Sequence, residues 1–307
     1  MCPVCNRRLY KSSIEYKVED YLRSKNIKFY SNYKGLHLRF DNSSKDIELD
    51  LYLPDYGIAF EFNGYYYHHS GPFGKPKYYH RDKTVLCLNK GINLYHLWED
   101  SPEDMIISII ESKLGLTERV YARKTQIKEV DSKFFNENHV DGDCKSLKRW
   151  GLFYNNECYA AISLRVTSDG HPEIARFCNK KHFTVIGGYS KLLNHLISYC
   201  KSSNFRLNLI SYCNRDLSPD PLNNFYSNYG FTLVRECSLI MKYFSTKRID
   251  ELGVISSKIY NRQVFQKFKV KGLLKDSDNL SEIEINEKLG VYPVFNSGNF
   301  RYELVLN

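Results

Sequence analysis

The segment IELDLYLPDYGIAFEFN, residues 47–63, constrains the fold more than any other part of the chain. Apolar and polar residues alternate on both sides of the letters PDYG, which predicts two half-buried β-strands. Proline presets its own φ angle and glycine accepts a positive one, so PDYG predicts a turn. A symmetric hairpin then places Leu53 opposite Ile58 and Asp50 opposite Glu61.

Two carboxylates directly opposite each other share one face of the hairpin. Like charges in that position destabilise a sheet by up to about 1 kcal/mol. Either one carboxyl is protonated or a cation lies between Asp50 and Glu61, and hard oxygen ligands suit Mg²⁺. The alternative is that both residues belong to an ordinary solvated face. The next segments favour the cation: NGYYYHH follows at once, then a helix predicted over residues 78–90 and a strand over 92–98.

Length and composition set the outer limits. A chain of 307 residues with 42% hydrophobic content predicts two domains and a small appendage. We expect no membrane association, because the sequence contains no run of about 18 apolar residues and no signal peptide. The nine cysteines are expected to be free thiols in the cytoplasm.

The net charge of +9 and the 25 tyrosines indicate a nucleic-acid partner. Residues 1–116 hold 16 Lys and Arg against 15 Asp and Glu, whereas the remainder holds 28 against 20. The positive excess therefore lies in the C-terminal part, where a nucleic-acid anchor is expected.

Two features stand at the N-terminus. Cys2 and Cys5 have the C-x₂-C spacing of half a zinc knuckle, but without a second pair we expect no bound zinc. Ser12 or Ser13 can then cap a helix, whose first turn holds Glu15. A surface glutamate stabilised by the helix dipole is one reading of Glu15.

Several of these pieces, in order, resemble the EDxHD homing endonucleases, relatives of the very-short-patch-repair (Vsr) endonuclease in the PD-(D/E)xK superfamily. The resemblance covers residues 14–116 and uses Glu15, Asp50, Glu61 with Asn63 and Gly64, Tyr67 with His68, the letters HRDK at residues 80–83, and LWED. As in those branches, Asn63 stands where the wider superfamily has a catalytic lysine.

The resemblance implies a Mg²⁺- or Mn²⁺-dependent hydrolysis of phosphodiester bonds. Asp50 and Glu61 would hold the metal, and His68 would act as general acid or base. Asp82 would orient His68, and His69 would point away from the site if that segment stays extended.

The same resemblance implies supporting roles for four further residues. Glu15 would orient a metal-bound water, and Lys83 or Arg81 would contact phosphate. Tyr66 belongs to an aromatic run that would wedge between bases.

The second half follows a different pattern. Two strands around Asn155-Asn156 predict a hairpin, and further strands flank an amphipathic helix that follows Gly187-Gly188. This order resembles the GNAT acyltransferase fold over residues 119–247. The letters VIGGY stand where an acyl-CoA loop usually reads R/Q-x-x-G-x-G/A, so we expect a module for DNA contact or structure, without acyl-CoA.

The C-terminal residues 248–307 alternate basic and aromatic side chains. They predict a surface that tracks phosphate and stacks on bases, although a solvated basic face fits equally well. The residues that carry this prediction are Arg262, Lys267, Lys269 and Lys271.

The sequence therefore predicts an α/β chain with four parts: a zinc-knuckle remnant (1–13), a PD-(D/E)xK/Vsr-like nuclease domain with a mixed sheet flanked by helices (14–116), a GNAT-like α/β domain (117–247) and a small basic DNA-contacting unit (248–307). The predicted function is a metal-dependent homing endonuclease that cuts double-stranded DNA in a phage-infected bacterial cell. The alternatives are a GNAT-type acyltransferase that modifies nucleic acid and a non-catalytic DNA-binding protein.

Overall fold

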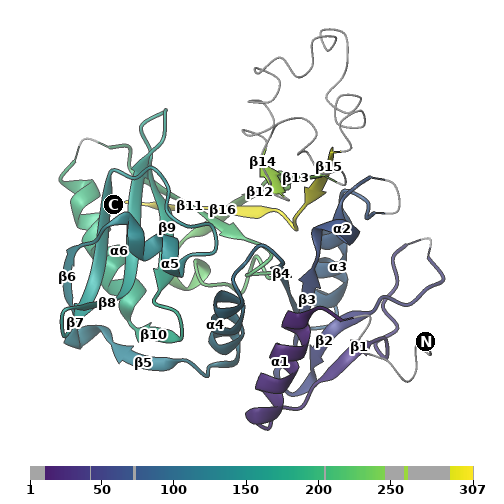
Figure 1. Ribbon diagram of the computed structural model, residues 1–307. Coiled ribbons are helices and arrows are strands. Elements are labelled where there is room, and N and C mark those ends of the chain that lie inside the picture. The colour runs from purple at the N-terminus through teal and green to yellow at the C-terminus, as the bar shows by residue number, and fades with distance from the viewer. Residues whose placement is uncertain are drawn as a thin grey trace, which may run out of the picture.

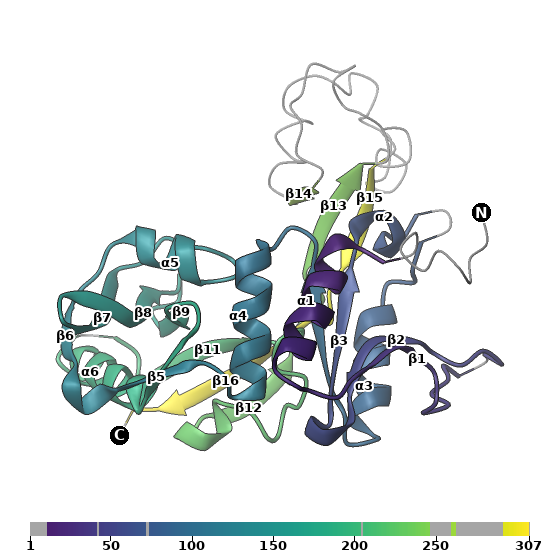
Figure 2. The ribbon, with the colours of Figure 1, turned by 60° about the horizontal axis from the view of Figure 1, so that its bottom comes forward.

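The computed structural model describes residues 11–41, 43–71, 74–203, 205–245, 259–261 and 291–306. Within them the chain forms a four-stranded sheet, a seven-stranded sheet and two smaller sheets. The two larger sheets occupy separate lobes, with helix α4 between them (Figure 1; Figure 2). Cys2 and Cys5, the predicted zinc-knuckle remnant, lie outside the described residues.

The four-stranded sheet, which we call the first sheet, contains the predicted hairpin. Its strands in spatial order are β1 (Tyr30–Tyr33), β2 (Leu49–Leu53), β3 (Ile58–Asn63) and β4 (Asn93–Trp98). Leu53 pairs with Ile58, and the connecting turn η2 (Pro54–Tyr56) ends on Gly57 with φ 62°. The predicted register is therefore confirmed. β3 continues into a parallel pairing with β4.

Helices cover both faces of the first sheet. α1 (Ser13–Ser24) and α4 (Glu103–Leu114) bury their apolar stripes with Phe60 on one face. α3 (Tyr79–Leu88) packs Cys87 against Ala59 and Leu94 on the other face. α2 (Tyr65–His68) forms a single helical turn directly after β3. The expectation of an extended segment here is wrong, because Tyr67 N–H donates to Gly64 O at 3.2 Å and closes the turn.

The seven-stranded sheet, which we call the second sheet, has the spatial order β12-β16-β11-β9-β8-β7-β6. Asn155 and Asn156, at φ 48° and 65°, form the predicted turn between β7 and β8. Helix α5 (Ser132–Asn138) covers one face and α6 (Gly188–Lys201) the other. The strands are β6 (Gln126–Glu129), β7 (Lys148–Tyr154), β8 (Glu157–Val166), β9 (Pro172–Asn179), β11 (Asn208–Asn214), β12 (Thr232–Glu236) and β16 (Asn299–Val305).

The last strand joins the second sheet from far along the chain. β16 runs antiparallel to both β11 and β12 and lies between them. Residues beyond position 247, the predicted end of the GNAT-like domain, therefore complete its sheet. The yellow β16 is visible between β11 and β12 in Figure 2.

Two small sheets connect these units. β13 (Met241–Ser245) pairs with β14 (Ile259–Asn261) and β15 (Val291–Phe295), and Phe244 and Val294 pack on Tyr65 of α2. β5 (Glu118–Tyr121) pairs in parallel with β10 (Phe183–Ile186). The remaining described elements are two short 3-10 turns, η3 (Ala122–Lys124) and η4 (Ser227–Tyr229). No helix in the described part of the chain is long and apolar enough to cross a membrane.

Candidate functional site

The two hairpin carboxylates lie together, as the register requires. Asp50 N–H donates to Glu61 Oε1 at 3.2 Å, and Phe62 N–H donates to Asp50 Oδ2 at 2.8 Å. Each carboxylate therefore accepts a hydrogen bond from the backbone of the opposite strand. This arrangement ties β2 to β3 through their side chains.

Lys83 of α3 supplies the positive charge next to this pair. Its ammonium donates to Glu61 and, at 2.7 Å, to Glu48 O. Both Lys83 and Glu61 are 2% exposed. Burial and the neighbouring Asp50 raise the pKa of Glu61 to about 7. Burial opposes the charged form of Lys83, but Glu61, Tyr79 and Asp50 hold the pKa of Lys83 above its ordinary value.

A fixed ammonium therefore takes the place that we assigned to a divalent cation. In the described ranges, no group of three or more His, Cys, Asp and Glu residues is arranged to hold a metal ion. The structure brings three predicted site residues together: Asp50, Glu61 and Lys83. It brings them together as a buried ion-pair network.

His68 is partly buried and stacks on the buried imidazole of His80. Its Nδ1 is 3.2 Å from His80 Nε2, and the ring centroids are 4.9 Å apart. Burial lowers the pKa of His68 to about 3, so this imidazole is neutral at physiological pH. Asp82, the predicted partner of His68, instead pairs with Arg81 at 2.7 Å. The structure does not bring Asp82 and His68 together.

Glu15 has a local structural role. Ser12 N–H and Ser12 Oγ both donate to Glu15 Oε1, at 3.0 and 2.8 Å. Together with the bond from Glu15 N–H back to Ser12, this forms the capping box of α1. Glu15 is partly buried, and burial raises its pKa against the lowering effect of the Ser12 hydrogen bonds, with the charge of Asp50 adding to the rise.

The predicted DNA-contacting residues have separate locations. Tyr66 on α2 is 61% exposed. The Arg81 guanidinium lies 4.2 Å from the centroid of the Tyr78 ring. The basic C-terminal residues Arg262, Lys267, Lys269 and Lys271 lie outside the described residues.

The second sheet contains a wider opening, which we call the splay cleft. β9 and β11 are parallel neighbours, but they pair only at Glu173 with Ile210 and at Ile174 with Ser211. Beyond these pairs the strands separate, and a cavity of about 820 Å³ lies between residues 175–179 of β9 and 212–214 of β11. The facing backbone edges in this opening do not pair with each other, although the outer edges pair with β8 and β16.

The chain leaves the end of β9 through β10 and enters α6 at a pair of glycines. Gly187 has φ 74° and provides the N-cap of α6 without a side-chain hydrogen bond. A Cβ on Gly188 would be 2.8 Å from Val185 Cβ, so this glycine allows close packing. Lys191, in the first turn of α6, donates to Ala122 O at 2.9 Å and fixes η3 beside the helix N-terminus.

Tyr226 also lines the splay cleft. Its N–H donates to Asn224 Oδ1 at 2.9 Å, and its ring stacks on Tyr302 of β16 with centroids 5.4 Å apart. Burial raises the pKa of Tyr226 above its ordinary value, so the phenol stays protonated in the working pH range. The cleft therefore contains a fixed hydroxyl that can donate a proton.

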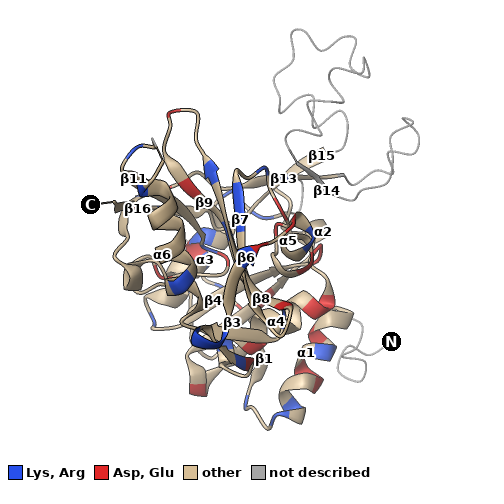
Figure 3. Cartoon of the chain, turned by 90° about the vertical axis from the view of Figure 1, so that its left-hand side faces the viewer, with Lys and Arg blue, Asp and Glu red and all other residues tan. Residues whose placement is uncertain are grey.

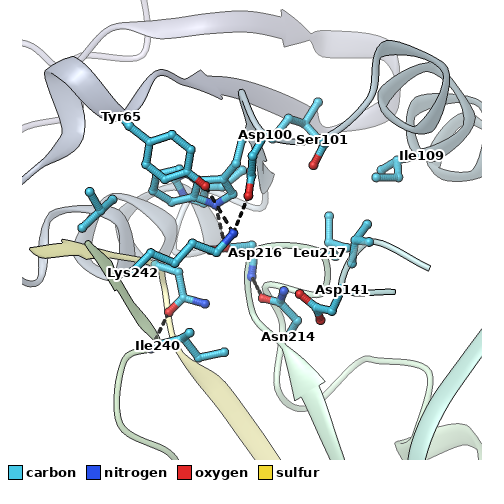
Figure 4. Close-up of a pocket in the computed structure, with 16 residues that line it drawn as sticks. Tyr65, Asp100, Ser101, Ile109, Asp141, Asn214, Asp216, Leu217, Ile240 and Lys242 are labelled. Carbon is cyan, nitrogen blue, oxygen red and sulfur yellow. Dashed lines mark hydrogen bonds and ion pairs between the residues drawn. The ribbon is translucent and has the colours of Figure 1, made fainter. Parts of the chain in front are cut away.

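A smaller cavity of about 80 Å³ adjoins the splay cleft at Asp141, Asn214 and Leu217 and lies between the two lobes. Figure 4 shows Lys242 reaching Asp100 and the Tyr65 hydroxyl across it, at 2.6 and 3.2 Å. The carboxylate of the neighbouring Asp216 accepts from Ser297 N–H and Trp98 Nε1–H, each at 2.9 Å. The charged groups of this interdomain cavity thus hold the lobes together.

Sequence reasoning missed Tyr226 and the splay cleft. The letters NFYSNYGF, residues 224–231, are typical of a turn before a strand, but they give no reason to expect the Tyr226 side chain in a cavity. The missing pairing between β9 and β11 has no local sequence signal, because strand periodicity describes faces and not edges.

Comparison with proteins of known structure finds acetyltransferases that resemble part of this chain, with TM-scores of 0.30 and 0.31. A GNAT family acetyltransferase from Elizabethkingia anophelis with acetyl-CoA bound is 11% identical, with a TM-score of 0.31, over 59% of this chain and 98% of that one. The IAA acetyltransferase from Bacillus cereus is 12% identical, with a TM-score of 0.30, over 59% and 99%.

The ribosomal-protein-S18-alanine N-acetyltransferase from Escherichia coli is 15% identical, with a TM-score of 0.30, over 40% of this chain and 85% of that one. No protein-family model matches the chain, and no curated protein matches it. The likeness concerns the mixed α/β fold.

These findings correct the predicted activity. The solved structures named above are acetyltransferases, and neither they nor the buried Lys83–Glu61 ion pair supports the EDxHD/Vsr segment. The predictions of a Mg²⁺-dependent endonuclease and of a chain without acyl-CoA are therefore wrong. The ammonium of Lys83 lies beside Asp50 and Glu61, in the place where the nuclease prediction needs a metal ion, and this is the physical reason that the nuclease prediction fails.

Proposed function

We propose that this chain is an acyltransferase that takes its acyl group from a coenzyme A thioester. The observation that carries the proposal is the splay cleft, where two parallel strands part after two residue pairs. When bound, the thioester supplies an activated acyl group. The protein supplies an enclosed channel, free backbone edges and a proton donor.

The splay cleft suits the amide-containing arm of coenzyme A. Separated strands present N–H and C=O groups that an extended chain can pair with, as in β-strand addition. The facing segments are residues 175–179 and 212–214, around a cavity of about 820 Å³. These edges would hold the arm in one orientation along β9.

The start of α6 suits the diphosphate. A helix N-terminus presents free N–H groups and the positive end of the helix dipole. α6 has 14 residues, and no side chain caps it. The adjoining η3 carries Arg123 and Lys124, both exposed. These residues would hold the negative charge of the diphosphate beside the start of α6.

Tyr226 would protonate the leaving sulfur. The departing thiolate needs a proton, and the Tyr226 phenol still carries one at the working pH, although the rise in its pKa on burial makes it a weaker acid. Tyr226 lines the cleft, and burial keeps the pKa of its hydroxyl above the ordinary value. The bond from its N–H to Asn224 and the stack on Tyr302 fix its position.

The proposal is tested by titrating the full chain with acetyl-CoA in a calorimeter. We expect 1:1 binding that is lost in Ala175→Trp, because residue 175 lines the cleft and an indole would fill it. Val166→Trp is the matched control on an exposed strand position. Absence of acetyl-CoA binding, or equal binding by a folded Ala175→Trp protein, would refute the proposed function.

We further propose double-stranded DNA as a partner of the chain. The net charge of +9 supports this, since phosphate contacts by Lys and Arg release counterions. Charges of both signs are interspersed along α1, so no single-sign surface is evident on that helix (Figure 3). A duplex-binding titration between 50 and 200 mM salt tests the proposal: we expect a fall in affinity on the order of 10³-fold, and salt-independent or absent binding would refute it.

A further inference from the structure

Lys113 is a partly buried amine that belongs to α4 and lines the splay cleft. Its side chain lines that cleft and also a neighbouring cavity of about 210 Å³. Its Nζ donates to Leu217 O at 2.6 Å and lies 4.7 Å from the centroid of the Tyr95 ring. Among the described residues, no carboxylate forms an ion pair with it.

Two other lysines show how unusual this environment is. Lys83 is more deeply buried, but the carboxylate of Glu61 holds it charged. Lys180 lines the same 210 Å³ cavity, and its ammonium pairs with Glu157. Lys113 instead contacts the Leu217 carbonyl and the Tyr95 ring, with the Cys213 thiol close enough to interact with its charge. Burial without a carboxylate lowers the pKa of Lys113 to about 8.

This combination gives a nucleophile at neutral to mildly basic pH. At pH 8 about half of such amines are uncharged, compared with roughly one in 250 for an ordinary lysine. A neutral amine can attack a thioester carbonyl, whereas an ammonium cannot. The cavity beside Lys113 also has room for a short acyl group.

We propose that Lys113 is an autoacylation site, whose ε-amine accepts the acyl group of a thioester held in the splay cleft. The inference rests on the proposed function. The ammonium first releases one proton to solvent. The neutral amine nitrogen then forms a bond to the acyl carbon, and the carbon–sulfur bond breaks. The nitrogen loses a second proton, and the departing thiolate takes up one proton to become a thiol. The products are an amide on Lys113 and a free thiol.

The modified side chain can stay in place. An amide nitrogen keeps one N–H, which can continue to donate to Leu217 O. The positive charge over the Tyr95 ring is lost, so the modified side chain presents an uncharged surface to the cleft. Acylation at this position would therefore change what the cleft can bind.

The first experiment tests the amine itself and needs no coenzyme. The full chain is treated briefly with N-hydroxysuccinimidyl acetate between pH 6.5 and 10, and acetylation at each lysine is quantified by peptide mass spectrometry. We expect Lys113 to react about 10²-fold faster than Lys180 at pH 8, because more of its amine is neutral. Equal pH profiles for the two lysines, or no reaction at Lys113, would overturn the inference.

The second experiment tests transfer from the thioester. The chain is incubated with isotope-labelled acetyl-CoA, with and without excess free coenzyme A as competitor. We expect one added acetyl group at Lys113 that the competitor suppresses, and none in Lys113→Arg, while slow acetylation of Lys180 is unaffected. If acetyl-CoA binds in the calorimeter but Lys113 stays unmodified, the autoacylation inference is wrong and the proposed function still stands. Failure to bind acetyl-CoA would sink the proposed function, whatever the reagent labelling shows.

Discussion

The first and second sheets both place polar groups between two strands, but with opposite results. In the first sheet, Glu61 accepts from Asp50 N–H, Asp50 accepts from Phe62 N–H, and Lys83 pairs with Glu61. In the second, β9 and β11 leave facing edges without mutual bonds around a cavity of about 820 Å³. In the first sheet the polar groups already bond to one another. In the second sheet the facing backbone groups of β9 and β11 remain available to a ligand.

The comparison teaches that a concentration of charge is a poor guide to a binding site. A buried polar group that already has its partners contributes to structure, and a ligand would have to displace them. A strand edge with open groups has no such competitor. The predictions below test this difference, from the largest expected effect to the smallest.

Removing one member of the buried network should have the largest effect on stability. Lys83→Met leaves Glu61 without its counter-charge, so we expect the free energy of unfolding to fall by about 3–5 kcal/mol. Urea unfolding at pH 7 measures it. The double variant Lys83→Met with Glu61→Gln removes both charges and should recover part of the loss. A loss below about 1 kcal/mol for Lys83→Met would place this network in the same class as a surface pair.

Removing the cleft hydroxyl should affect the rate and leave stability nearly unchanged. Tyr226→Phe keeps the stack on Tyr302 but cannot donate a proton. We expect kcat for acyl transfer to fall by about 10²-fold, with the Kd for acetyl-CoA within a factor of a few of the parent. The exposed Tyr121→Phe is the matched control. A parent-like kcat in Tyr226→Phe would show that the leaving sulfur takes its proton elsewhere.

Crowding the glycine pair should perturb the second sheet more mildly. In Gly188→Ala, the new Cβ would come within 2.8 Å of Val185 Cβ and 3.2 Å of Leu152 Cδ1. We expect a loss of about 1–3 kcal/mol from overpacking. A thermal-denaturation midpoint equal to that of the parent would show that the first turn of α6 shifts to accommodate the new Cβ without a loss of stability.

The smallest effect concerns a contact between the lobes. His182 lies between Glu111 and Asp104, at 2.6 and 2.7 Å, Lys181 also pairs with Asp104, and Tyr21 donates to Glu111. Burial lowers the pKa of His182, but the bonds to Glu111 and Asp104 outweigh it and raise that pKa above 6.5. The protonated form is the one that pairs, so its contribution is complete below pH 6.5 and is lost as pH rises through the raised value.

His182→Asn removes this pH dependence. Asparagine tolerates the positive φ of 67° at this position, so the backbone should be preserved. We expect the difference in unfolding free energy between pH 5.5 and pH 8.5 to shrink by about 0.5 kcal/mol, since the pair is partly exposed. An unchanged difference would assign the pH dependence to other groups.

The sequence was sufficient to predict the features that neighbouring residues determine, such as the turn and the strand register. The letters PDYG set the turn, which set the register and placed Asp50 beside Glu61. The side chain that fills the space between them comes from Lys83, more than 20 residues later, and its position depends on how α3 packs. The same limit hid the splay cleft, because its opening depends on strands separated by the whole of α6. Tyr65–His68 was misjudged for another reason: Gly64 allows the chain to turn into a helix where aromatic residues favour a strand.

The position of β16 has a consequence for how the chain matures. Residues 299–305 occupy a place between β11 and β12, about 85 residues after β11 in the sequence. The first sheet uses strands within residues 30–98 and can close early during synthesis. The second cannot close until its last strand leaves the ribosome. Until then β11 and β12 expose bare edges to other chains, so a nascent or truncated polypeptide should aggregate through this half of the molecule.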